Sequence, residues 1–554
     1  MMKKLLSILL ASVLIITALC GLSVSAEENT NAISVYSGAP DYDFWLVRLE
    51  GSEREVTIMT ADQLMAFADL TLGYDFAGWT IKLGADMVIN AGDASTWATT
   101  APQYTWKCST TWAYRFAGNF DGQGHVISGL YSKYGQECGL FGTITGGNTI
   151  QNVSIVNSYF EFESQNADGD VCLMGGIVGY IDGNNNSGKY DNLTTTIKNV
   201  YVNATLFTDC AVPAPNGQTT KTAVGGIVGM MGNTSYQDLV IENVVFEGNL
   251  TSSYRNMGGI IGRTLIYSGG TVTIKNCSVD ADICSINEDE PNAGGVIGQV
   301  GGTNVVVEDC VVKATFKTNV NKMTAAFIGF ANVTRSIQIK ANDVLMVITP
   351  IATGDSGVIF RSMLMNYYTT ANLTVDFSNI TYVKGGFVTY PEGMLHIAKT
   401  GGEANISGGD FEATIAAAAD VKGQAVFTGW TAVDGGYPIP AGVTVPTIDL
   451  DVYKNAASTT PSTPDNGGDN NTDNSNDNNN NDNNSSNNNN NNSNTNTNNG
   501  SDNNASTTET TAATTDASVE EKSGCGSSMG LAGISALALT AVIAVVPFKK
   551  KEEN

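Results

Sequence analysis

A short glycine-flanked unit recurs through the middle of this 554-residue chain and restricts the folds open to it. Each copy has two small residues, two apolar residues and a glycine, as in residues 225–229 (GGIVG). The copies lie at 138–142, 175–179, 225–229, 258–262 and 294–298, with a weaker one at 325–329. Start-to-start intervals run from 31 residues (294 to 325) to 50 (175 to 225). Repeats of this length are typical of solenoids, in which neighbouring units bury each other's apolar faces.

A second motif follows each copy and predicts short strands. It reads apolar, polar, Asn, then alternating apolar residues, as in Ile197-Lys198-Asn199-Val200. Its clear copies are at 150–153, 197–200, 241–244, 274–277 and 307–310. A period of two, rich in Val, Ile and Thr, is the pattern of strands, and the Gly and Asn clusters between them predict turns. Stacked copies would lie one strand spacing apart, about 4.8 Å.

Stacking of this kind places equivalent side chains next to one another. The recurrent Asn residues should therefore form a ladder of side-chain amides. Cys277 and Cys310 occupy the same repeat position, so we expect stacked neighbours, either as a disulfide or as two buried thiols.

Together the two motifs resemble the GLUG motif of bacterial cell-surface proteins. The resemblance extends roughly over residues 54 to 445, with an entry region at 60–64, 80–83 and 120–125 and a closing segment at 429–438. It implies an all-β fold, a right-handed parallel β-helix solenoid similar to the pectin-lyase-like architecture. Immunoglobulin-A-cleaving metallopeptidases can carry such repeats, but they need an HExxH motif, which this chain lacks.

The two ends of the chain differ in composition from the repeats. Residues 1–26 have two lysines, an apolar run and a small-residue cleavage site, the pattern of a secretory signal. Residues 456–521 are mainly Asn, Asp, Ser and Thr, which predicts a disordered linker. Residues 529–548 are apolar and precede three lysines, which predicts a transmembrane helix. We therefore expect an exported protein, anchored at the cell surface through a retained span or a processed sorting signal.

These features divide the chain into six expected segments. They are a signal peptide (1–26), an N-terminal cap with the first rungs (27–135), the GLUG-repeat β-helix (136–385), C-terminal rungs and cap (386–455), the linker (456–521) and the C-terminal anchor with its basic tail (522–554). Thr60 and Gln63 match a capping box that opens a short helix. The apolar face of that helix should cover the first rung.

Charge and histidine content exclude several classes of function. Lys and Arg total 28 and Asp and Glu total 54, a net charge of −26, which argues against nucleic-acid binding. His125 and His396 are the only histidines, so multi-histidine metal sites are excluded. Neither histidine has an acid partner at useful spacing, and both are expected to be structural. No cofactor fingerprint or metal-ligand spacing is present.

Acidic and aromatic side chains supply the remaining candidates. Asp280, Asp282 and Asp309 are close in repeat terms and would be either calcium ligands or, as we favour, solvated outer-face carboxylates. One inserted loop concentrates aromatic residues, and its candidate ligand-binding residues are Trp97, Tyr104, Trp106, Trp112 and Tyr114. Exposed aromatic rings can stack on sugar rings. The alternative is a loop packed as a cover on the β-helix.

Three functions stay open at this point. The first is a non-enzymatic surface protein that adheres to a carbohydrate or another host or cell-surface ligand. The second is a polysaccharide lyase or hydrolase on the same fold. The third is a structural spacer. Fold alone does not separate them.

Overall fold

A computed structural model describes the folded part of the chain. The described residues are 33–107, 115–133, 137–163, 171–182, 192–209, 222–232, 237–253, 255–265, 269–285, 292–318, 323–352, 362–384, 395–397, 405–408 and 413–457. All of them fall within one structural unit, residues 1–466. The predicted signal peptide and anchor, and the predicted linker from residue 458 onward, lie outside these residues. Among the described residues, no helix is long and apolar enough to cross a membrane.

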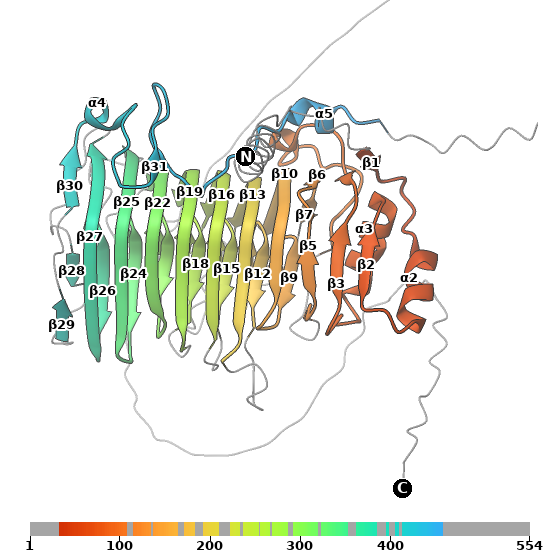
Figure 1. Cartoon of the computed structure of the whole chain (residues 1–554), viewed down its shortest axis with the longest axis horizontal. Coiled ribbons are helices and arrows are strands. Elements are labelled where there is room, and N and C mark those ends of the chain that lie inside the picture. Colours follow the sequence, from red (N-terminus) through yellow and green to blue (C-terminus); the bar gives the residue numbers. More distant parts are fainter. Residues whose placement is uncertain are drawn as a thin grey trace, which may run out of the picture. The chain divides into compact units, whose positions relative to one another are not determined.

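Parallel strands stack into three sheets, which makes the molecule a parallel β-helix (Figure 1). The long strands of the first sheet are β10 (Thr149–Glu163), β13 (Thr194–Asp209), β16 (Asp238–Ser252), β19 (Thr271–Ser285), β22 (Asn304–Thr318), β25 (Ile337–Ala352) and β27 (Asn372–Lys384). Its short strands are β1 (Ile33–Val35), β2 (Glu55–Ile58), β3 (Thr80–Leu83), β4 (Asp86–Val88), β5 (Asn119–Asp121), β6 (Val126–Ser128), β7 (Tyr131–Lys133), β29 (Asn405–Gly408) and β30 (Ala413–Ala416).

The other two sheets flank each glycine motif. The second sheet contains β8 (Glu137–Cys138), β11 (Cys172–Gly175), β14 (Thr222–Gly225), β17 (Asn256–Gly258), β20 (Asn292–Gly294) and β23 (Thr324–Ala325). The third contains β9 (Phe141–Ile144), β12 (Val178–Ile181), β15 (Val228–Met231), β18 (Ile261–Thr264), β21 (Ile297–Val300), β24 (Ile328–Val333), β26 (Met365–Thr369) and β28 (Leu395–Ile397). The predicted all-β solenoid is confirmed, and it continues beyond the last recognisable copy through β25 to β30.

Both sequence motifs set the register of stacking. Val200 pairs with Val153 on one side and Val244 on the other. Gly225 pairs with Gly175 and Gly258 in the second sheet. Equivalent motif residues are therefore neighbours in a sheet, as the repeat pattern predicts.

The second glycine of the motif lies where two turns of the chain approach closely, whereas the weaker copy has Ala326 at this position. A β-carbon built at Gly226 would lie 2.2 Å from the Gly259 carbonyl oxygen and 2.5 Å from the Phe246 ring. At Gly259 a β-carbon would lie 2.2 Å from the Gly295 carbonyl oxygen. At Gly226 and Gly259, glycine is thus a steric requirement of the corner, not only a turn preference.

Two helices cover the N-terminal end of the core. α3 (Ala61–Leu70) begins at the predicted cap, where the Thr60 hydroxyl accepts a hydrogen bond of 3.2 Å from the backbone N–H of Gln63. Its buried face comprises Leu64, Phe67 and Ala68. α2 (Tyr42–Glu50) has no counterpart in the sequence prediction, and its fully buried Trp45 lies against the ring of Phe67 at 5.5 Å between ring centroids.

A residue in the left-handed region interrupts each long strand; it is Asp309 in β22, Asp343 in β25 and an asparagine in the others. Asn152, Asn199 and Asn243 have φ values of 54°, 53° and 54°, which Asn tolerates better than most residues. Asn199 Nδ2 donates to Asn152 Oδ1 at 2.9 Å, and Asn243 Nδ2 donates to Asn199 Oδ1 at 3.1 Å. We call these three residues the asparagine ladder. The predicted amide stacking is confirmed for them.

The C-terminal segment folds back along the outside of the solenoid. Figure 1 shows it in blue, passing from α4 (Ala418–Val421) near β27 to α5 (Leu450–Lys454) near β10. Between these helices lies a short antiparallel pair, β31 (Trp430–Thr431) and β32 (Ile439–Pro440). The segment covers outward-facing apolar side chains on several turns, namely Tyr201, Val245, Val311 and Leu345. The sequence predicts C-terminal rungs and a cap over residues 386–455, whereas the described chain from Trp430 onward runs back over earlier turns.

The last part of this segment, which we call the C-terminal strap (residues 439–457), is fastened to the first rungs. The Tyr453 hydroxyl donates to Asp86 Oδ2 at 2.8 Å. The Gly92 N–H donates to the Lys454 carbonyl oxygen at 2.8 Å, and Lys454 Nζ lies 3.1 Å from Asp93 Oδ2.

Cys277 and Cys310 are register partners in β19 and β22, as the sequence predicts. Both are free thiols, 1 % and 2 % exposed, so the thiol alternative describes this structure.

Candidate functional site

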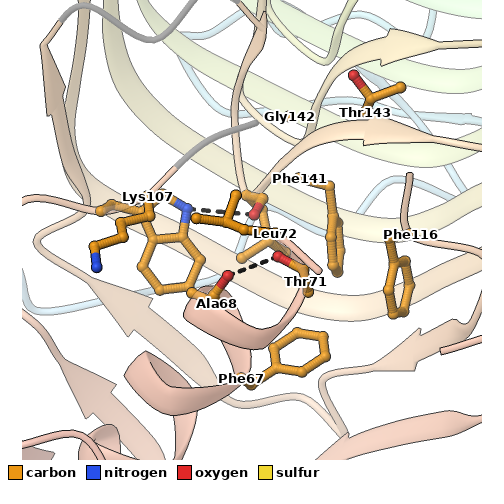
Figure 2. A pocket seen from close by; sticks show the side chains of 11 residues that line it. Phe67, Ala68, Thr71, Leu72, Lys107, Phe116, Phe141, Gly142 and Thr143 are labelled. Atoms are coloured by element: carbon orange, nitrogen blue, oxygen red, sulfur yellow. Dashed lines mark hydrogen bonds between the residues drawn. The ribbon is translucent and has the colours of Figure 1, made fainter. Parts of the chain in front are cut away.

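Trp106 packs into the N-terminal end of the core. Its indole is 2 % exposed, and Nε1 donates to the Gly139 carbonyl oxygen at 3.1 Å. Figure 2 shows the surroundings, in which Phe116 and Phe141 stack with ring centroids 4.5 Å apart. The cavity here measures about 20 Å³, enough for one water molecule. The indole of Trp106 is therefore packed in the core, and the cavity beside it is too small for a sugar ring.

Trp97 and Tyr104 line an open concavity of about 400 Å³ near the first rungs. We call it the aromatic concavity and define it by Tyr36, Trp97, Thr100, Ala101, Gln103 and Tyr104. Trp112 and Tyr114 lie outside the described residues. The structure thus brings two of the five candidate residues together and separates Trp106 from them.

A buried asparagine fixes the aromatic wall of this concavity. Asn90 is 4 % exposed, accepts a hydrogen bond of 2.9 Å from the Tyr104 N–H, and donates to the Tyr104 and Gly129 carbonyl oxygens at 2.8 and 2.9 Å. The rings of Tyr104 and Tyr36 meet edge to face, with centroids 4.6 Å apart. Burial, followed by the nearby carboxylates, raises the pKa of Tyr36 to about 12. Tyr104 itself is only half-buried, so it can offer part of its ring to a ligand.

Trp97 is packed against a neighbouring ring and is not the exposed stacking surface that a ligand-binding role would require. It follows a single 3-10 turn, η1 (Ala94–Thr96), and its ring packs edge to face against Tyr131 with centroids 6.0 Å apart. The indole is 4 % exposed. Like Trp106, it has no free ring face for stacking, and it serves as the floor of the concavity.

One carboxylate borders the concavity. Asp93 accepts a hydrogen bond of 3.0 Å from the Ser95 N–H and pairs with Lys454. The backbone hydrogen bond from Ser95, with that from Lys454 next, lowers the pKa of Asp93, so the group is ionised at neutral pH. Among the described residues that line the concavity, no second carboxylate accompanies it. The pair of carboxylates that glycoside hydrolysis uses is therefore incomplete among the described residues of this concavity.

The two histidines lie within the solenoid, and His125 contacts a carboxylate. His125 Nδ1 lies 2.9 Å from Asp86 Oδ1, a partner that sequence spacing could not indicate across 39 positions. The other oxygen of Asp86 is bonded by Tyr453, so this carboxylate joins the strap to the first rungs. His396 lies in β28 beside Asn366 of β26.

The carboxylates proposed as outer-face groups are engaged by neighbouring strands. Asp280 pairs with Lys313, and Asp282 pairs with Lys317 at 2.5 Å. Asp309 accepts a hydrogen bond of 3.1 Å from Trp430 Nε1. Within the described residues no group of three His, Cys, Asp or Glu side chains could hold a metal ion.

Comparisons with known proteins add little to this geometry. No family model matches the chain, and no curated protein matches it. One solved structure is similar, that of a candidate immunoglobulin A1 protease from Bacteroides ovatus. The identity is 18 % and the TM-score 0.36, over 71 % of this chain and 94 % of the other. Similarity at this level supports no statement about substrate or activity.

Proposed function

We propose that this protein is a non-enzymatic, surface-displayed β-helix that binds neutral glycans at the aromatic concavity. The proposal includes the right-handed winding, the membrane or wall anchorage and the relation to GLUG proteins that the sequence predicts. Its main support is the concavity itself, in which a half-buried tyrosine ring, hydroxyls and an exposed amide surround about 400 Å³. Sites of this composition suit sugars, since aromatic surface contacts C–H faces and polar groups contact hydroxyls.

Charge selects the class of glycan. The chain has a net charge of −26, and Asp93, the carboxylate that borders the concavity, is already paired with Lys454. The net negative charge repels uronate-rich or sulfated polymers, and the described residues that line the concavity include no Lys or Arg to bind them. Neutral hexose oligomers avoid this cost.

The alternatives make different predictions. A lyase or hydrolase would release shorter products from a bound polymer, and a spacer would bind nothing. The single carboxylate of the concavity favours binding without turnover over hydrolysis.

A matched pair of substitutions tests the site. Ala101 and Ala98 are both exposed, but Ala101 lines the concavity and Ala98 does not. In the full chain, Ala101→Trp should fill the concavity and weaken binding of neutral oligosaccharides about tenfold, which is about 1.4 kcal/mol. Ala98→Trp should bind as the unmodified chain does. Equal binding by both variants would exclude this concavity.

A further inference from the structure

A second concavity lies between the asparagine ladder and the C-terminal strap. It measures about 300 Å³ and is bordered by Asn152, Asn199 and Asn243 on one side and by Gly442, Thr444 and Pro446 on the other. We call it the ladder groove. It contains none of the residues that define the aromatic concavity.

The strap is held firmly enough to form a preformed wall. A β-carbon at Gly442 would lie 2.7 Å from Asn276 Nδ2 and 3.1 Å from Asn243 Oδ1, so the strap backbone crosses directly on these side chains. Next to it, Val443 is 5 % exposed and packs in one apolar cluster with Val245. The bonds of Tyr453 fix the far end. The groove thus needs no rearrangement to exist.

The ladder leaves hydrogen-bonding capacity on its open side. A carboxamide has two N–H donors, and Asn152, Asn199 and Asn243 each donate one, to Asp121, Asn152 and Asn199 respectively. In the described part of the chain, their second N–H groups have no protein partner, and Asn199 is an exposed residue. Ser154 and Thr444 add hydroxyls to the same groove. These groups can donate to and accept from an uncharged polar ligand.

The apolar part of the lining is also suited to such a ligand. Val153, Val200, Tyr201 and Pro446 supply carbon surface. The Tyr201 hydroxyl is already bonded to Glu247 at 2.7 Å, and burial raises the pKa of this phenol, so the ring acts as a neutral wall. None of the described residues that line the groove is Asp, Glu, Lys, Arg or His. A charged ligand would therefore have no oppositely charged side chain among these lining residues to pair with.

We infer that the ladder groove is a second binding site for neutral saccharides, distinct from the aromatic concavity. The inference rests on the proposed function, which supplies the class of ligand. The asparagine ladder and the C-terminal strap supply the location of the site. Sugar hydroxyls would bond to the free amide N–H groups of the ladder and to the Thr444 hydroxyl, while C–H faces pack on Pro446. The row of equivalent amides, one per turn, suits a linear oligosaccharide that offers hydroxyls in a row.

The repeat provides a matched pair of variants for the test. Asn199 and Asn379 are exposed and occupy the same repeat position on different turns, with φ values of 53° and 51°, and Gly adopts this region readily. Asn199→Gly removes an amide that lines the groove, whereas Asn379→Gly removes one that does not. The probe is a neutral hexose oligosaccharide series from two to six units, titrated against the full-length protein and both variants, with thermal melts to confirm folding.

We expect Asn199→Gly to weaken binding of the longer oligosaccharides about fivefold to tenfold and Asn379→Gly to leave it unchanged. Equal affinities for the two variants would overturn it. Loss of binding in Asn199→Gly with unchanged binding in Ala101→Trp would support the groove and contradict the aromatic concavity. The reverse result would leave the proposed function intact and overturn the groove. A complete lack of saccharide binding by the unmodified chain would contradict both.

Discussion

The Tyr453 hydroxyl donates a 2.8 Å hydrogen bond to Asp86, a residue 367 positions earlier, and so joins the end of the described chain to the first rungs. The same carboxylate contacts His125 and the Val126 N–H through its other oxygen, Oδ1. One buried side chain therefore connects the strap, a turn and a strand. The outer wall of the ladder groove depends on this connection.

Tyr453→Phe should loosen the strap without unfolding the solenoid. It removes one hydrogen bond to a charged group, worth about 1–2 kcal/mol. The Gly92 N–H, which donates to Lys454, should then exchange its hydrogen about tenfold faster or more. Tyr437→Phe is the control, because the Tyr437 hydroxyl has no hydrogen bond to another described residue. Equal exchange rates at Gly92 in the two variants would show that the strap is held by other contacts.

Gly226→Ala should be strongly destabilising. The added methyl group would come within 2.2 Å of the Gly259 carbonyl oxygen, so backbone must move in two adjacent turns. We expect a loss of about 2–4 kcal/mol in the free energy of unfolding, measured in urea. Gly73→Ala makes the same change where nothing lies within 4 Å, and it should cost less than about 1 kcal/mol. A mild effect at Gly226 would contradict the close approach of the corners.

Alkaline pH should destabilise the N-terminal region. Burial raises the pKa of Tyr36 to about 12, and the hydrogen bond to Asp69 raises that of Tyr42 to about 12. An unfolded tyrosine titrates near pH 10. The folded state holds these protons more tightly, so its extra stability is complete below about pH 10 and is lost as pH rises through about 12. Thermal melts should show this fall, and Tyr36→Phe should make it shallower. A stability that rises between about pH 10 and pH 12 would contradict this prediction.

Cys277 and Cys310 should be unreactive in the native protein. Burial, with the neighbouring thiol next, raises the pKa of Cys310 well above its usual range, so the reactive thiolate is scarce. Partly exposed Cys284 should be alkylated before the buried pair, which reacts only after unfolding. Peptide mass spectrometry of alkylated samples measures the order. Rapid native labelling of Cys277 would mean that β19 and β22 open locally.

Local repetition made the solenoid predictable from sequence. The Gly pairs and the Asn positions mark the same points on each turn, so their spacing indicates which residues stack. Stacking of Cys277 on Cys310 and the amide contact between Asn199 and Asn152 followed from that regularity.

The strap and the site geometry were not predictable in the same way. The bonds Tyr453–Asp86 and Trp430–Asp309 span 367 and 121 positions and carry no local pattern. One signal was present: Tyr201 and Val245 are large side chains at an outward position next to the ladder, where period-two alternation calls for polar residues. Such a row indicates a covering segment. The burial of Trp97 and Trp106 likewise depends on distant partners that an aromatic count does not show.

The most direct test of the account is titration calorimetry of the full-length protein with a neutral hexose oligosaccharide, followed by chromatography of the recovered ligand. We expect saturable binding and recovery of the oligosaccharide at its original length. Shortened products would establish an enzyme, and a flat titration across neutral gluco-, galacto- and manno-oligosaccharides would contradict glycan recognition.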